Sequence, residues 1–169
     1  DKSFSIPRLQ LIKDLFVFSC YTGLCYGDVM NLTHDNMCLG IDSKQWIYSK
    51  REKTSVPIKI PLLSKALVII KKYETHPNTE IKQTLFPTIS NQKLNSYLKE
   101  IADVCGIRKN LTFHIARHTF ATTVTLSNGV PIETVSKLLG HRKITTTQIY
   151  AKVIERKVGE DMQRLEQRF

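Results

Sequence analysis

Four side chains in the second half of this 169-residue chain have types and spacing that suit chemistry on a phosphate group. His114 and Arg117 are three residues apart, so on a helix they share one face, and the guanidinium can bind two phosphate oxygens at once. His141 follows a glycine at the expected end of another helix, where its imidazole can donate to a phosphate oxygen. Tyr150 offers a phenol that becomes a nucleophile where cations stabilise the phenolate. This order favours cleavage of a phosphodiester without a metal.

Lys53 is the candidate proton donor for the leaving oxygen of such a reaction. It lies in or beside an expected β-turn, where most lysines are simply solvated. A lysine crowded by cations over a phosphate can instead release its proton and act as an acid. Taken singly, each of these residues has an ordinary structural explanation, and only their combination indicates a site.

His118 makes a second pattern, because it stands four residues after His114 as histidines do in helical zinc sites. A zinc hydrolase with that motif would carry Glu at position 115, and the residue there is Ile. We therefore expect no metal at this site and assign His118 a supporting, structural role. A metal hydrolase is kept as a rival.

The hydrophobic pattern predicts the elements that must position these side chains. It indicates a mainly helical chain with a small three-stranded antiparallel sheet, an α+β fold. Helices are expected over residues 8–21, 27–32, 63–73, 90–105, 113–126 and 131–139, with a short turn or helix from 145. Strands are expected over 37–39, 45–49 and 56–60, the last at a sheet edge because of its prolines, and a polar loop over 76–78. The whole of 1–169 is expected to form one domain, with 1–6 as a linker remnant and 153–169 as a tail helix.

The charge points to a polyanionic partner, with nucleic acid as the first candidate. The net charge is +10, and the basic excess gathers in residues 44–59 and 107–143, around the candidate site. No stretch approaches the ~20 apolar residues of a membrane span, and no signal peptide opens the chain. Four widely spaced cysteines indicate reduced thiols in a cytoplasmic, intracellular protein. The first residue, Asp1, suggests a piece of a longer protein.

Together these motifs resemble the catalytic domain of the tyrosine recombinases, also called phage-type integrases. The matching motifs are Thr22-Gly23-Leu24, Lys53-Thr54, His114-x-x-Arg117, Leu139-Gly140-His141 and Tyr150. The resemblance implies that Tyr150 attacks the scissile phosphate and leaves a 3′-phosphotyrosyl linkage, while Lys53 protonates the leaving 5′-oxygen. It also implies that His114, Arg117 and His141 hold the phosphate and handle protons.

The chain departs from the family at Cys25, where the pattern Thr-Gly-Leu-Arg has its arginine. Asp28 matches the acidic residue that the family keeps near that arginine and that helps to order the site. Arg51 is a possible substitute, because residues two apart on a strand share a face, and Lys53 would then lie about 7 Å along the chain. If the turn begins before Lys53 this reasoning fails, and Arg51 is expected only to touch flanking DNA backbone.

The resemblance implies a site-specific recombinase of a mobile element that works without a cofactor as a tetramer on paired sites of double-stranded DNA. It also implies a separate N-terminal core-binding domain that this chain lacks, and a tail that packs on a neighbouring subunit or in cis. Two further rivals are a catalytically impaired DNA-binding member of the same fold, favoured by Cys25, and a type IB topoisomerase.

Overall fold

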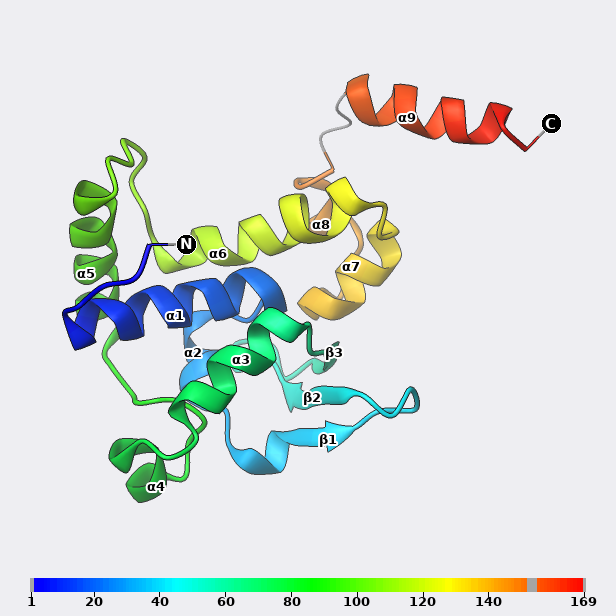
Figure 1. The fold of residues 1–169 in the computed structure, drawn as a ribbon. Coiled ribbons are helices and arrows are strands. Elements are labelled where there is room, and N and C mark those ends of the chain that lie inside the picture. Colours follow the sequence, from blue (N-terminus) through cyan, green and yellow to red (C-terminus); the bar gives the residue numbers. More distant parts are fainter. Residues whose placement is uncertain (1, 152–154, 169) are drawn as a thin grey trace.

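Helix α1 (Pro7–Thr22) is the central element around which the other helices pack. The computed structural model describes residues 2–151 and 155–168, and in it α1 contacts α3 (Ser64–Tyr73), α5 (Asn91–Val104) and α6 (Phe113–Thr119). Figure 1 shows α6 along one side of α1 and α3 along the other. The apolar spacing predicts an inward face of Leu9, Ile12, Leu15, Phe16 and Cys20. All of these are buried except Phe16, which is half-buried, and Phe18 is fully buried as well.

A three-stranded antiparallel sheet lies against this helical body, as predicted. Its strands are β1 (Met37–Leu39), β2 (Gln45–Lys50) and β3 (Pro57–Pro61), in the order β1-β2-β3. Ile47 of β2 pairs with Ile60 of β3, and both side chains face the core while their neighbours face solvent. β3 is an edge strand, which agrees with the prolines at its two ends.

A second, smaller apolar cluster holds the elements that carry His141 and the tyrosine. It consists of Phe120, Ala121, Val135, Leu139 and Tyr150, and it brings α7 (Ile132–Leu139) and α8 (Thr145–Gln148) onto the end of α6. Helix α6 joins the main core to this second cluster, and the candidate site lies where the two clusters meet. The remaining elements are α2 (Tyr26–Met30), the 3-10 turn η1 (His34–Asn36), α4 (Pro77–Lys82) and α9 (Glu155–Glu166).

Two sequence expectations about helices are wrong. Residues 77–82 form α4 instead of a polar loop, because Pro77 supplies the first helical turn and the ring of His76 accepts from the Asn78 amide at 3.2 Å. The helix expected over 113–126 ends at Thr119 and continues as a π turn (Phe120–Thr125) and a 3-10 turn (Leu126–Asn128).

Threonine hydroxyls account for this change of helix type. The Thr125 hydroxyl shares its proton between the backbone carbonyls of Phe120 and Ala121. The Thr122 hydroxyl donates to the carbonyl of His118. Such bonds to carbonyls one turn back compete with the helix's own hydrogen bonds and bend it. As a Thr at a helix start, Thr112 is predicted to cap α6 but makes no side-chain capping bond, whereas Ser90 caps α5, as predicted, by accepting from the Lys93 amide.

The tail helix expected from residue 153 is α9, although residues 152–154 and 169 lie outside the described part of the chain. Its apolar side chains Val158, Met162 and Leu165 are all exposed. α9 lies outside the body formed by the other elements (Figure 1). Among the described helices, none is both long and apolar enough to cross a bilayer.

Candidate active site

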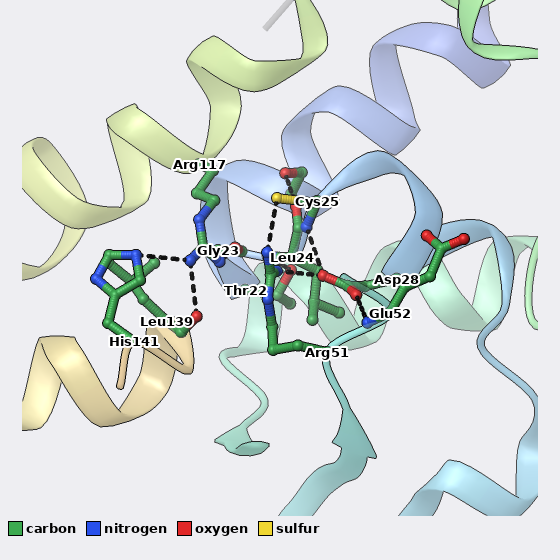
Figure 2. Close-up of polar contacts among 11 residues, drawn as sticks. Thr22, Gly23, Leu24, Cys25, Asp28, Arg51, Glu52, Arg117, Leu139 and His141 are labelled. Carbon is green, nitrogen blue, oxygen red and sulfur yellow. Dashed lines mark hydrogen bonds and ion pairs between the residues drawn. The ribbon is translucent and has the colours of Figure 1, made fainter. Parts of the chain in front are cut away.

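Arg117 is the most deeply buried charge of the site, and three groups hold its guanidinium. Nη1 donates to the Gly23 carbonyl at 2.7 Å, and Nη2 donates to the Leu139 carbonyl at 2.7 Å (Figure 2). Nη2 also lies 3.0 Å from His141 Nε2. Only 4% of Arg117 is exposed, so these acceptors replace the water that a buried cation loses.

The backbone at Gly23 is shaped to give Arg117 its first acceptor. Gly23 ends α1 in the left-handed conformation (φ 71°), and its amide donates back to the Ser19 carbonyl. A Cβ at this position would lie 2.5 Å from the Phe120 ring, so glycine is required by space as well as by φ. The turn therefore places the end of α1 directly against the helix that carries Arg117.

Arg51 places a second guanidinium in the site, beside Cys25. Its Nη2 donates to the Cys25 sulfur at 3.2 Å, and its Nη1 forms an ion pair with Asp28. The Asp28 carboxylate also accepts from the amides of Glu52 at 2.9 Å and Cys25 at 3.2 Å. Figure 2 shows the Arg51 guanidinium joined to Cys25 and Asp28, while the Arg117 guanidinium is joined to His141 and the Leu139 carbonyl. Because the Arg51 and Asp28 side chains are 10% and 2% exposed, each neutralises an otherwise costly buried charge.

Arg51 lies beside Cys25 for a reason other than the strand face, shared with Lys53, that the sequence suggested. Strand β2 ends at Lys50 and the turn occupies residues 52–54, so the expected shared face of Arg51 and Lys53 does not exist. Arg51 is the closing residue of the hairpin, and its amide donates to the Val56 carbonyl at 2.9 Å. Its aliphatic stem runs past Gly140, where a Cβ would meet Arg51 Cγ at 2.7 Å. Lys53 points into solvent at the tip.

His141 lies beside Arg117 in a loop that Gly140 makes possible. Gly140 ends α7 with φ 64°, and the His141 amide donates to the Ser136 carbonyl. Burial, and then the nearby cations Arg117 and Arg51, lower the pKa of His141 from 6.5 to about 4, so the ring is neutral at physiological pH. Burial is also the largest reason why the pKa of Arg117 is lowered, but a guanidinium stays charged at physiological pH.

Tyr150 is packed between two of the predicted histidines. Its ring stacks on His141 at 6.4 Å between centroids with only 7° between planes, and meets His118 edge-on at 5.0 Å. It is 7% exposed. His118 therefore supports the tyrosine ring, in keeping with the structural role expected for it.

The structure thus joins six of the nine predicted site positions by direct contacts in two adjacent groups of three, one centred on Arg51 and one on His141, and adds His118 through the tyrosine ring. His114 and Lys53 are exposed, and among the described residues neither makes a hydrogen bond or ion pair with the cluster. The six positions are Cys25, Asp28, Arg51, Arg117, His141 and Tyr150. In residues 2–151 and 155–168 no three His, Cys, Asp or Glu side chains gather as metal ligands.

Three participants were not predicted, namely the carbonyls of Gly23 and Leu139 and the side chain of Thr147. The hydroxyl of Thr147 lies 2.8 Å from His141 Nδ1. Backbone carbonyls carry no residue-type signal, so no reading of motifs would have found the first two. The position of Thr147, three residues before Tyr150 on an expected helix, was the available signal for the third.

Comparison with known proteins matches this site to a family. A model described as the phage integrase family covers residues 8–156, nearly the whole of the helical body and the site. The chain belongs to the phage integrase family of tyrosine recombinases.

Relatives of this integrase-family chain include tyrosine recombinase XerD of Listeria monocytogenes, 32% identical over 143 residues, which cover 78% of this chain and 46% of the relative. The XerD of Halalkalibacterium halodurans is 31% identical over 158 residues, 89% of this chain and 50% of that protein. The chain therefore spans about half the length of the curated relatives it matches.

Solved structures share the fold. The XerH site-specific recombinase bound to a palindromic difH substrate, in a post-cleavage complex, superposes with a TM-score of 0.72 at 20% identity, over 98% of this chain and 48% of that one. A lambda integrase dimer bound to a COC′ core site gives 0.64 at 21% identity, over 86% of this chain and 53% of that one. The predicted helical catalytic-domain fold with its small sheet is confirmed.

The lowered pKa of His141 predicts a dependence of stability on pH. Because the unfolded chain binds this proton near 6.5 and the folded chain only near 4, the unfolded state gains a proton first as the solution is acidified. The stabilisation is complete above about pH 6.5 and declines as the pH falls toward 4. Urea titrations of the free energy of unfolding against pH measure it.

His141→Gln should flatten that decline, because it removes the titrating ring. His34→Gln is the matched control, since it removes an exposed imidazole by the same substitution. A decline of equal slope in His141→Gln and the parent would contradict the assignment.

Gly140→Ala should lower the free energy of unfolding by more than the strain of a left-handed backbone alone accounts for. Gly129→Ala has the same left-handed backbone (φ 80°) in open space and should cost roughly 1–2 kcal/mol of folding free energy. Gly140→Ala adds contact with Arg51 and Ile58, and should cost a further ~1–3 kcal/mol. Equal losses for the two variants, measured by urea denaturation, would show that the stem of Arg51 does not pack there.

Proposed function

We propose that residues 1–169 are the catalytic domain of a site-specific DNA recombinase of a mobile element. It cleaves and rejoins double-stranded DNA through a 3′-phosphotyrosyl intermediate. The observation that carries the proposal is the proximity of two guanidinium groups, with Arg51 bonded to Cys25 and Arg117 bonded to His141, on which the Tyr150 ring stacks. Two fixed cations beside a phenol and an imidazole are what a transesterification at phosphate requires.

In the proposed reaction the Tyr150 oxygen attacks the scissile phosphorus and displaces the 5′-oxygen of the next nucleotide. Arg51 and Arg117 bind the non-bridging oxygens, with Arg51 in the role that the family gives to an arginine at position 25. His114 and His141 donate to the phosphate, and Lys53 protonates the leaving oxygen. The exposed positions of His114 and Lys53 suit side chains that meet DNA from the protein surface.

The partner we propose is duplex DNA bound at paired sites by a tetramer of the full-length protein. Support comes from the net charge of +10 and from recombinases of the same fold that were solved on DNA. The exposed apolar side chains of α9 support a tail that packs on a neighbouring subunit. No cofactor is needed, since the attacking and leaving groups are both oxygen and no electron is transferred.

Tyr150→Phe tests the central step. The Phe variant should bind DNA as the parent does, because the ring and its contacts with His118 and His141 are kept. It should form no covalent adduct with a nicked suicide substrate, since the attacking oxygen is gone. Denaturing gels measure the adduct.

The same assay separates the two rivals of the same fold. A parent that binds but forms no adduct is the impaired DNA-binding member, and a parent that relaxes supercoils without paired sites is a type IB topoisomerase. An adduct formed by Tyr150→Phe at the parent's yield would remove Tyr150 from the mechanism.

Arg51→Ala tests the substitute cation. Loss of one fixed donor to a transition-state oxygen costs about 10²–10³ in rate, so cleavage should fall by that factor. DNA binding should fall no further than in Lys50→Ala, the matched control, which removes an exposed cation one residue away. Single-turnover adduct formation and a binding titration give the two numbers.

Cys25→Arg added to Arg51→Ala should restore part of the cleavage, because it returns a cation to the same place beside Asp28. The double variant also controls for misfolding of Arg51→Ala, since a protein that was simply unfolded would not regain cleavage. Cleavage by Arg51→Ala at the level of Lys50→Ala would leave the site with Arg117 as its one clamping arginine.

A further inference from the structure

Thr147 is a buried polar residue of the site whose hydroxyl faces the ring of His141. It lies in α8, is 0% exposed, and its Oγ1 is 2.8 Å from His141 Nδ1. Its backbone is engaged separately, with its amide donating to Ile144 and its carbonyl accepting from Tyr150. Among the described residues, His141 is the hydrogen-bond partner of this hydroxyl.

The neighbours of His141 determine which ring nitrogen carries the proton. A guanidinium has only donors, so the 3.0 Å contact from Arg117 Nη2 requires that His141 Nε2 accept. The single proton of the neutral ring is then on Nδ1, and it is donated to Thr147 Oγ1. In the structure the hydroxyl therefore acts as an acceptor.

The proposed reaction needs the other tautomer. To donate to a phosphate oxygen, His141 must carry its proton on Nε2, and Nδ1 must then accept a hydrogen bond. A threonine hydroxyl can do both, because it has one donor and two acceptor sites. The tautomers exchange without change of charge. Nε2 gains one proton from water and gives up its bond from Arg117 Nη2, while Nδ1 loses one proton to water when its bond to Thr147 opens. The hydroxyl then re-forms that bond as a donor.

We propose that Thr147 is a positioning residue of the recombination reaction, whose hydroxyl holds the ring of His141 in place through both neutral tautomers. This inference rests on the proposed function. The hydrogen bond joins the His141 loop to the turn that carries the nucleophile, because Thr147 also accepts from the Tyr150 amide at 3.0 Å. The parallel stacking of the His141 and Tyr150 rings is consistent with this link.

The test compares Thr147→Val with Thr147→Ser. Valine keeps the shape of threonine without a hydroxyl, whereas serine keeps the hydroxyl. Thr146→Val is the matched control, because it makes the same change at an exposed position one residue away. Two readouts are needed, namely the protonation of the His141 ring by ¹⁵N NMR without DNA and single-turnover adduct formation on a nicked suicide substrate.

We expect the parent, Thr147→Ser and Thr146→Val to show a proton on Nδ1 that exchanges slowly with water. In Thr147→Val that proton loses its acceptor and exchanges fast. Adduct formation by Thr147→Val should fall by about 10- to 100-fold, the usual loss when an outer partner of a functional histidine is removed, with DNA binding unchanged. Thr147→Ser should stay within a few-fold of the parent.

Three results would overturn the inference. They are a parent ring protonated on Nε2, adduct formation by Thr147→Val equal to that of Thr146→Val, and a Thr147→Ser variant as slow as Thr147→Val. If the parent forms no adduct at all, the proposed function fails instead. Thr147 is then judged by NMR alone, where loss of the protected Nδ1 proton in Thr147→Val supports the positioning and its retention contradicts it.

Discussion

The burial of the Arg117 guanidinium is the constraint on which the rest of the site depends. A cation with 4% exposure needs several acceptors, and the chain supplies them from the ends of two helices, at Gly23 and Leu139. Because these acceptors are main-chain carbonyls, they reach Arg117 only if α1 and α7 end at fixed residues. The left-handed glycines that end both helices thus serve the site as much as the fold.

A second guanidinium beside the first creates a repulsion that has to be offset. Arg51 and Arg117 each lower the proton affinity of the neutral His141 ring, so the field at the site is strongly positive. Asp28 offsets part of it, and its carboxylate is held by the Arg51 ion pair and two backbone amides. The proposed function uses this arrangement, because fixed donors bind the charge on a phosphate with little reorganisation.

Local pattern was sufficient to predict the elements and the residue types of the site, but not the path that brings them together. The spacing of apolar residues located α1, α5, α7 and all three strands within a residue or two. It missed α4 and the π turn after Thr119, where side-chain hydrogen bonds to the backbone decide the outcome. Arg51 does lie beside Cys25, but not for the reason predicted, since its place depends on the hairpin closing at residue 51 and on a long-range approach to Gly140.

The contacts of the Asp28 carboxylate explain why this chain can have Cys25 where the family has an arginine. Arg51 reaches the Asp28 carboxylate from the hairpin and forms an ion pair with it on the side that faces the site. An arginine at position 25 would compete for the same carboxylate and add a third guanidinium to a buried space that already holds two. A thiol at that position accepts from Arg51 Nη2 and adds no cation. Under the proposed function, positions 25 and 51 are therefore coupled, and the reaction needs a cation from one of them, not from both.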